Sequence, residues 1–300
     1  MIAKTLSFGS PGKLSIRDRQ LVYDGEDGLH RTFSVEDLGF VVLETGRILV
    51  TSACLQALAA ANVAVVVCDP AHTPLAQLLP FAANSTSHET AEAQLAATPA
   101  AQGRLWRRIV RSKLRNQAAL LESLGRPEAK QLGRLAETVR NDDPANCEAQ
   151  GARLYFRALA PEPDFRRNPG EGWPNAALDY GYAVLRAATA RALVGSGLVC
   201  FRGIHHHNRY NPFCLADDVM EPYRPFVDQF VFRPSSPLES APDGSLGKAA
   251  KASLLSCLTC DVAIGGLTRP LMIALSSTTA SLARCYLEKS MDILLPAFLP

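Results

Sequence analysis

The segment ANSTSHETAEAQLAATPA, residues 83–100, divides the chain into two parts with different hydrophobic patterns. The segment is polar, rich in small residues and without aromatic side chains, so it predicts a linker or an exposed helix. Before it, short apolar or alternating runs are separated by Gly and Pro turn signals, which is typical of β-strands. After it, apolar residues recur at three- and four-residue steps, which is typical of helices. The predicted fold class is α+β, with a β-rich N-terminal domain over residues 1–82 and a larger, almost all-α domain over residues 83–300.

The N-terminal part carries three stretches with a strand pattern, IAKTLSF, KLSIRDRQLVY and FVVLET. One helix is predicted between strands, at SACLQALAAAN, with Ser52 as its cap. The chain has 300 residues and is 47% hydrophobic, which is enough for a substantial core and for two domains. In the C-terminal part the helical period predicts helices over residues 104–124, 128–139, 144–159, 174–194, 247–263 and 269–295.

Charge and cysteine content restrict the class of protein only weakly. The formal net charge is +2, so the overall balance does not identify a nucleic-acid binder. Of eight cysteines, only Cys257 and Cys260 form a CxxC pair, and their helical, apolar surroundings favour core packing over zinc binding. No signal peptide and no membrane-spanning run are evident, so a reducing cytoplasm and no membrane partner are expected.

The stretch GIHHHNRYNPFCLADDVMEPYRPFVD, residues 203–228, concentrates three histidines and four acids. Asp218 and Glu221 stand three residues apart, which places both on one face of a helix where they can bind a cation. The alternative is a solvated acidic helix start, with Asp217 and Asp218 at the positive end of the helix dipole and ordinary loop histidines. Because consecutive side chains diverge, at most one or two of the histidines are expected to bind one ion.

A second acid, Glu148, lies in DPANCEAQGARLYF, which has the pattern of an amphipathic helix. Asp143 is predicted to cap this helix and Pro144 to occupy its first position. From the residues alone, a surface glutamate on such a helix is the favoured interpretation of Glu148, because a lone glutamate on a helix is seldom catalytic.

A basic stripe is predicted on the helix that contains GRLWRRIVRSKLRNQ. The spacing of its arginines places them along one face, where they could follow a phosphate backbone, whereas Lys113 falls outside this periodicity. The alternative is a solvated face tied by ion pairs, although few acids are near in sequence. The predicted DNA-binding residues are Arg104, Arg107, Arg108, Arg111 and Arg115.

These segments together resemble the CRISPR-associated spacer-acquisition integrase and endonuclease family (Cas-one). The resemblance is carried by Gly-x-x-His, then Asn, then Asp-x-Met-Glu-Pro-Tyr-Arg-Pro, within residues 203–225. Further matches follow the chain in order at VVLETGRILVTSACLQAL, NVAVVVCD, PLAQLLPF, NCEAQGARLYF and NAALDYGYAVLRA, so nearly the whole chain is covered. The shorter members that accompany type II systems are the most similar.

The resemblance implies a metal-dependent DNA integrase and endonuclease of CRISPR adaptation. In this family's reaction, the 3′-hydroxyl of a short DNA attacks a phosphodiester at the repeat boundary. The metal ligands carried over are Glu148, His206 and Glu221, with Asp218 as a supporting catalytic acid; an ungapped match from Gly203 selects His206 over His205 and His207. Carboxylates with one imidazole suit Mg²⁺ or Mn²⁺.

The resemblance also implies partners. DNA is the substrate, the chain forms a homodimer through the β-rich domain, and two dimers are bridged by a small ferredoxin-like subunit (Cas-two). Type II relatives additionally imply the effector nuclease and an accessory DNA-end-binding protein. Two other hypotheses stay open from the residues alone. One is a stand-alone metal-dependent nuclease acting on branched DNA, and the other is a non-catalytic DNA-binding scaffold.

Overall fold

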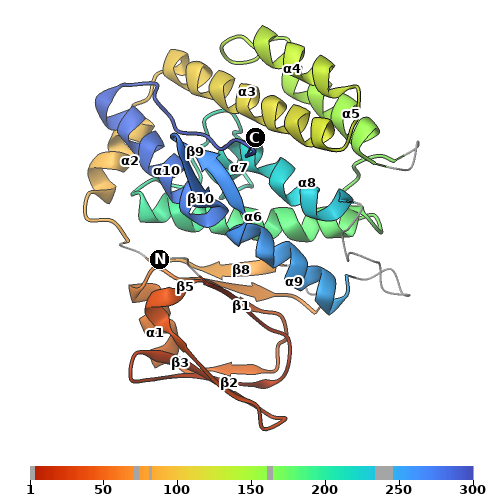
Figure 1. Cartoon of the computed structure of the whole chain (residues 1–300). Helices are drawn as coiled ribbons and strands as arrows, with labels where there is room; N and C mark the ends of the chain where they lie inside the picture. The colour runs from red at the N-terminus through yellow and green to blue at the C-terminus, as the bar shows by residue number, and fades with distance from the viewer. Residues whose placement is uncertain (1–3, 71–73, 81–82, 161–164, 234–245, 300) are drawn as a thin grey trace.

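The computed structural model describes residues 4–70, 74–80, 83–160, 165–233 and 246–299. A β-rich part occupies one end of the molecule and a helical part the other, with helix α6 (Asn175–Gly195) lying across the junction (Figure 1). The predicted α+β class is confirmed. The predicted division after residue 82 falls at residues 81–82, outside the described residues.

Two four-stranded sheets form the N-terminal part. The first has the order β1-β5-β7-β8, with β1, β5 and β7 parallel and β8 antiparallel. The second has the order β4-β3-β2-β6, and Asp18 and Arg19, both with positive φ, make the tight turn between β2 and β3. The strands are β1 (Lys4–Phe8), β2 (Gly12–Arg17), β3 (Gln20–Gly25), β4 (His30–Ser34), β5 (Leu38–Leu43), β6 (Ile48–Val50), β7 (Ala64–Cys68) and β8 (Pro74–Leu78), with helix α1 (Ser52–Ala60) between β6 and β7.

Strand β5, LGFVVL, is buried along its whole length because each of its faces meets a different core. Val41 and Leu43 pack into the core shared with the second sheet. Phe40 and Val42, on the opposite face, pack into the core that contains α6. A parallel strand covered on both sides has a continuous apolar sequence, and this strand follows that rule. The first sheet therefore packs against the second sheet on one face and against the helical part on the other.

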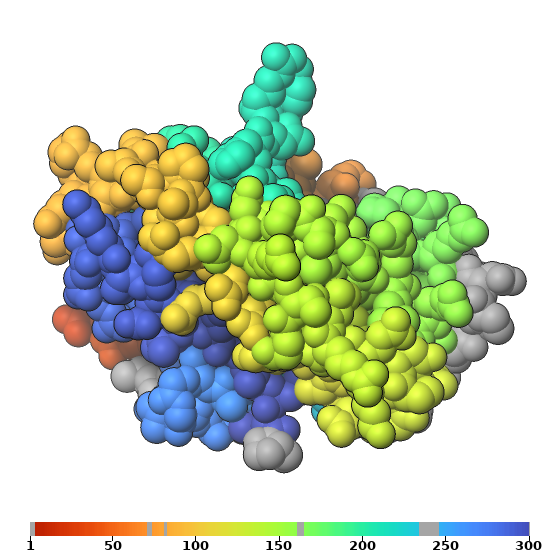
Figure 2. All heavy atoms as spheres, turned by 90° about the horizontal axis from the view of Figure 1, so that it is seen from above, coloured from red at the N-terminus to blue at the C-terminus, as the bar shows by residue number. Residues whose placement is uncertain are grey.

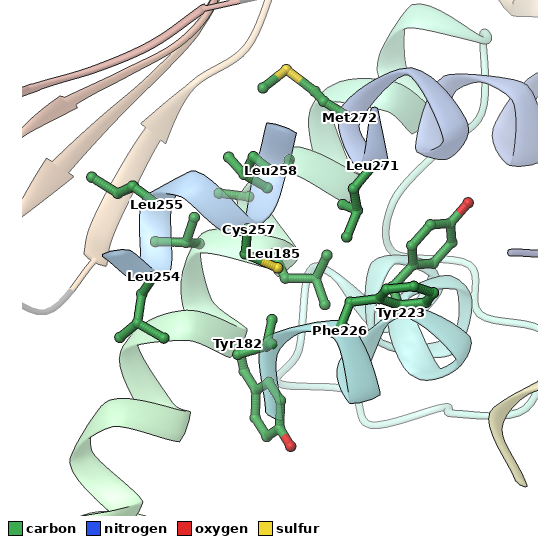
Figure 3. Close-up of a cluster of buried hydrophobic side chains, with 14 of the residues drawn as sticks. Tyr182, Leu185, Tyr223, Phe226, Leu254, Leu255, Cys257, Leu258, Leu271 and Met272 are labelled. Carbon is green, nitrogen blue, oxygen red and sulfur yellow. The ribbon is translucent and has the colours of Figure 1, made fainter. Parts of the chain in front are cut away.

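The helical part surrounds α6 and the long helix α3. Figure 3 shows side chains of α6, α8, α9 and α10 converging in one apolar cluster, including Leu185, Phe226, Leu254 and Leu271. No described helix combines the length and apolar character required to cross a bilayer. The helices are α2 (Ser87–Leu95), α3 (Pro99–Ser123), α4 (Ala129–Thr138), α5 (Cys147–Leu159), α7 (Cys214–Met220), α8 (Arg224–Phe232), α9 (Lys248–Ser256) and α10 (Leu271–Glu288).

Two predicted C-terminal helices were too long. Helix α9 ends at Ser256, and a β-hairpin follows, formed by β9 (Asp261–Ile264) and β10 (Leu267–Pro270). Gly265 and Gly266 both have positive φ, which permits the tight reversal between these strands. Helix α10 accordingly begins only at Leu271, after β10, and it ends at Glu288. Among its described residues, the C-terminal part is thus mostly helical, with one hairpin, connecting loops and an extended tail.

Three local predictions differ from the structure in detail. Thr51, not Ser52, caps α1, since its hydroxyl accepts a hydrogen bond from the N–H of Cys54. Helix α5 begins at Cys147, with Asn146 as its cap. The segment at residues 83–100 contains helix α2, which is not simply exposed. Its Gln94 is buried and its amide donates to the carbonyls of Val199 and Arg202.

Because β5 is buried on both faces, truncating one of its side chains should destabilise the protein much more than truncating an exposed side chain of another strand. Phe40→Ala should lower the free energy of unfolding by about 3–5 kcal/mol, because it leaves a cavity in a core that joins both parts. Urea denaturation followed by circular dichroism measures this loss. Leu49→Ala in β6 is the control, since Leu49 is 72% exposed and should change stability by less than about 0.5 kcal/mol. Equal losses of unfolding free energy in the two variants would contradict the conclusion that the first sheet belongs to both cores.

Candidate active site

Asp218 organises the loop that carries the three histidines. Its carboxylate is fully buried and accepts hydrogen bonds from the backbone N–H groups of Ile204 (2.6 Å), His205 (2.9 Å) and His206 (3.3 Å). The same carboxylate contacts Nδ1 of the His206 ring at 2.5 Å. This contact favours the tautomer with hydrogen on Nδ1 and leaves Nε2 available as a ligand atom. Asp218 therefore fixes both the backbone and the ring of His206.

Gly203 is required by the tight path of this loop. A Cβ atom at this position would lie 2.3 Å from the carbonyl oxygen of His206 and 2.9 Å from Oδ2 of Asp218. The first contact is with backbone, so it cannot be relieved by a rotamer change. The Gly-x-x-His spacing found in the sequence thus has a direct steric cause.

The three histidines have different surroundings. The ring of His205 stacks in parallel on Trp106 of α3, with 4.4 Å between centroids, and His206 meets the same indole edge-on at 5.7 Å. The His205 and His206 rings are perpendicular to each other. His207 is exposed. Figure 2 shows the loop near residue 205, coloured teal, projecting from the molecule. As predicted, the three rings do not converge on one point.

Glu148 and Glu221 are brought together around Lys113 of α3. The Nζ atom of Lys113 lies 2.7 Å from Oε1 of Glu148 and 2.5 Å from Oε2 of Glu221. Because both oxygens contact the same Nζ atom, the two carboxylates lie close to each other, separated by at most the sum of these two distances. The first contact is a hydrogen bond, whereas the second is an ion pair without hydrogen-bond alignment. The helix bearing Glu148 thus does fold back beside the segment bearing Glu221.

Electrostatics keeps these buried groups charged. Burial by itself would raise the pKa of Glu221, but Arg224, at 2.9 Å, and Lys113 outweigh burial and lower it. Burial would lower the pKa of Lys113, and Glu221 and Glu148 reverse that effect and raise it. The bond to Asp218 raises the pKa of His206, and the charges of Glu221 and Glu148 raise it further. The hydrogen bond from Asp218 is the largest cause of the raised pKa of His206.

The crossing of α3 and α5 sets the position of Glu148. A Cβ atom on Gly151 would lie 2.1 Å from Cδ2 of Leu114, so the two helices approach closely only because this residue has no side chain. Glu148 precedes Gly151 by one turn, and Lys113 precedes Leu114 by one residue. At the start of α5, the carboxylate of Asp143 accepts hydrogen bonds from the N–H groups of Cys147 and Glu148. Asp143 therefore satisfies the first two N–H groups of α5, although the N-cap position itself is Asn146 and Pro144 lies before the helix.

The donor set fits a hard divalent cation. Two carboxylates and one imidazole are ligands that Mg²⁺ and Mn²⁺ accept. The ammonium of Lys113 lies between the two carboxylates, which shows that positive charge is stabilised at that position. Within the described ranges, no three His, Cys, Asp or Glu side chains form a closed metal-holding group in this conformation. Lys113 separates the two glutamates instead.

The five predicted DNA-binding arginines line one groove of about 560 Å³ between α3 and the C-terminal tail. Arg111 and Arg115 both contact Glu137 of α4, and Arg115 does so at 2.8 Å. Glu137 lies 22 residues from Arg115 in sequence, so the residues near the arginines do not reveal that an acid neutralises part of their charge. Arg108 is 3.7 Å from Asp292, and Arg107 donates to Asn141. The groove is strongly basic but partly neutralised.

The basic groove and the carboxylates lie on opposite faces of α3. A helix turns by about 100° per residue, so Lys113 lies roughly half a turn around the axis from Arg104. Trp106 and Gln117 share the Lys113 side, and Trp106 contacts the histidine loop. Lys113, Trp106 and Arg224 were not predicted as site residues. The signal for Lys113 was its place outside the arginine periodicity, which directs its side chain inward.

Comparison with known proteins identifies the family of the chain. The family described as "CRISPR associated protein Cas1" matches residues 7–236. A "CRISPR-associated endonuclease Cas1" of Neisseria meningitidis serogroup C (strain 8013) is 40% identical over 232 residues, covering 77% of this chain and 75% of the relative. Two solved structures share the fold. A casposase bound to integration product has a TM-score of 0.77 at 19% identity, covering 97% of this chain and 92% of that one. A Cas6-RT-Cas1–Cas2 complex has a TM-score of 0.72 at 20% identity, covering 97% of this chain and 35% of that one.

The fold and the sequence similarity together define a CRISPR-associated endonuclease of the two-part type, with a β-rich part followed by a helical part. The chain belongs to the Cas1 family. The predicted family membership is therefore confirmed.

The contact between Asp218 and His206 predicts a pH dependence. Because the folded pKa of His206 is raised above its unfolded value of about 6.5, protonated His206 stabilises the fold below that pH. The contribution is lost as pH rises through the folded pKa. In Asp218→Asn the pKa of His206 should fall, as measured by NMR titration of the ring proton, with His206→Gln used for assignment. The matched control is Asp217→Asn, since Asp217 contacts Arg186 and Asn211 instead. An equal fall in both variants would contradict the specific role of Asp218.

Proposed function

We propose that this protein is a metal-dependent DNA integrase and endonuclease of CRISPR adaptation. It joins the 3′-hydroxyl of a short DNA to a phosphodiester of the repeat array. In this step one P–O bond forms as another breaks, and the proton of the attacking hydroxyl passes to the departing 3′-oxygen. The observation that carries the proposal is the convergence of Glu148 and Glu221 on one cationic position, the ammonium of Lys113. The fold shared with a casposase bound to integration product supports it.

Glu148, Glu221 and Nε2 of His206 would hold the Mg²⁺ or Mn²⁺ ion. When bound, the ion supplies Lewis acidity at the phosphate and stabilises negative charge on the attacking and departing oxygens. Asp218, proposed from sequence as a supporting acid, has both carboxylate oxygens engaged by the loop and His206. We therefore assign it to orienting His206 and holding a proton on Nδ1. Arg224 keeps Glu221 ionised in its buried position.

The arginine groove is the proposed DNA-binding surface. It is lined by Arg104, Arg107, Arg108, Arg111 and Arg115, and its size suits a sugar-phosphate backbone. Arg104 has no acidic partner among the described residues, and Arg107 donates to an amide oxygen, that of Asn141, so these two arginines are the most available for phosphate. Because the groove and the glutamates lie on opposite faces of α3, DNA that reaches both must pass around this helix.

The partners are proposed on separate grounds. A homodimer through residues 1–82 is supported by two apolar side chains that are exposed on the first sheet, Val67 on the inner strand β7 and Leu75 on the edge strand β8. A small bridging subunit is supported by the shared fold with a Cas1–Cas2 complex. The type II effector nuclease and an accessory DNA-end-binding protein rest on the sequence resemblance alone. Residues 83–300 form the proposed catalytic domain.

A strand-transfer assay tests the reaction itself. The protein, its bridging subunit and Mn²⁺ are incubated with a supercoiled repeat plasmid and either a 3′-hydroxyl or a 3′-blocked oligonucleotide. Only the 3′-hydroxyl oligonucleotide should become joined to the plasmid. Equal plasmid nicking with both oligonucleotides and no joining would instead favour hydrolysis by a stand-alone nuclease.

Removing one glutamate separates catalysis from binding. Glu221→Gln should reduce strand transfer by about a hundredfold or more, because it removes a charged oxygen ligand from a preorganised site. DNA affinity, measured by fluorescence anisotropy, should change little. Strand transfer at the unmodified rate would exclude Glu221 from the chemistry, and no transfer even in the unmodified protein would favour a DNA-binding scaffold.

The groove is tested by salt dependence. Arg104→Ala with Arg107→Ala should weaken DNA binding and reduce the slope of log affinity against log salt by about one for each lost phosphate contact. Arg17→Ala with Arg31→Ala is the matched control, because these exposed arginines lie on the second sheet, at the far end of the molecule from α3 (Figure 1). An unchanged slope for the α3 variant would remove the groove from the DNA path.

A further inference from the structure

Lys113 occupies the position that a divalent ion would need. Its side chain is 7% exposed, and its ammonium contacts one oxygen of each proposed carboxylate ligand, at 2.7 and 2.5 Å. A cation bound jointly by these oxygens would stand within a few ångströms of the ammonium. Two positive charges at that separation repel strongly where water is largely excluded. The ammonium and a divalent ion therefore cannot both occupy the space between Glu148 and Glu221.

A second position for the ammonium exists one helical turn away. Gln117, four residues after Lys113 on α3, is 2% exposed, and its Oε1 atom has no hydrogen-bond partner. A buried amide oxygen without a partner is costly, and such groups are uncommon in folded proteins. Residues four apart on a helix are neighbours, so a lysine side chain reaches that oxygen by changing rotamer.

The space needed for this movement is present. A cavity of about 230 Å³ adjoins the carboxylates and is lined by Lys113, Gln117, Glu148 and Glu221, among others. The unpartnered oxygen and the ammonium thus border the same cavity. Because no other described group satisfies Gln117 Oε1, a displaced ammonium is the donor that fits it.

We propose that Lys113 is a two-position cation that holds Glu148 and Glu221 together without metal and moves to Gln117 Oε1 when a divalent ion enters. This inference rests on the proposed role of the two glutamates as metal ligands. It assigns Lys113 and Gln117 as positioning residues, since neither would touch DNA or the ion. Metal affinity is then set in part by competition with the protein's own ammonium.

Metal affinity measured without any reaction tests the proposal. Mn²⁺ binding to the full-length protein is followed by electron paramagnetic resonance, which detects the free ion. Lys113→Met should lower the Kd for Mn²⁺ by about tenfold or more, because apparent affinity scales with the fraction of molecules whose ligands are free. Gln117→Leu should raise the Kd by about tenfold, because the displaced ammonium loses its acceptor.

The double variant distinguishes displacement from simple charge repulsion. If Lys113 moves to Gln117, then Gln117→Leu has no further effect once Lys113→Met is present. Repulsion alone would also tighten binding in Lys113→Met, but it would leave the Kd unchanged in the Gln117→Leu single variant, and that result would overturn the proposal. Lys251→Met is the matched control, because Lys251 is also buried and lies near a glutamate, Glu44, and its loss should not alter Mn²⁺ binding.

Thermal unfolding gives a second measurement. In EDTA, Lys113→Met should melt below the unmodified protein, because the buried Glu221 and the partly buried Glu148 lose their shared cation, and saturating Mn²⁺ should restore the Tm. If Mn²⁺ fails to bind the unmodified protein and Lys113→Met alike, the proposed metal site itself is wrong and this inference falls with it. If the unmodified protein binds Mn²⁺ and Lys113→Met binds it no better, only the two-position role is overturned.

Discussion

Burial of strand β5 on both faces is the constraint on which the arrangement of the molecule depends. Val41 and Leu43 belong to the core between the two sheets, whereas Phe40 and Val42 belong to the core around α6. A strand that alternates between two cores cannot move relative to either one without exposing apolar surface. The β-rich and helical parts therefore keep a fixed relation, and α6 is held where the remaining helices can pack on it.

Within the helical part, the site is built from charges that offset one another. Lys113 and Arg224 keep Glu221 ionised at a depth where an isolated carboxylate would take up a proton. Asp218 is buried at no evident cost in hydrogen bonding, because loop N–H groups and His206 satisfy its carboxylate. These contacts leave few alternative positions for the side chains that make them. This constraint also explains why glycines stand at positions 151 and 203, where any side chain would push a helix or a loop out of place.

Local patterns in the sequence predicted several elements of the fold correctly. The helical period located α3 and α5, and Asp143 was expected at the start of α5, where it accepts two N–H groups. The family motif proposed Glu148, His206 and Glu221 as site residues, and their role stays a prediction. The rest depends on contacts between distant segments. Nothing near Arg115 in sequence reveals Glu137, which reaches it from another helix. The periodicity of the arginines leaves Lys113 outside their stripe, but only the fold shows that its ammonium lies between Glu148 and Glu221. The hairpin after α9 replaced a predicted helix because two glycines permit a reversal that periodicity does not register.

The opposed faces of α3 have a practical consequence for protein engineering. Side chains on its arginine-bearing surface can be exchanged without touching Lys113 and the carboxylates on the opposite surface, so the two surfaces can be varied separately. The contact between Leu114 and Gly151 is different, because a side chain at position 151 would meet Leu114 where α3 and α5 cross. An exchange at that position disturbs the packing of the helix that carries Lys113 against the helix that carries Glu148.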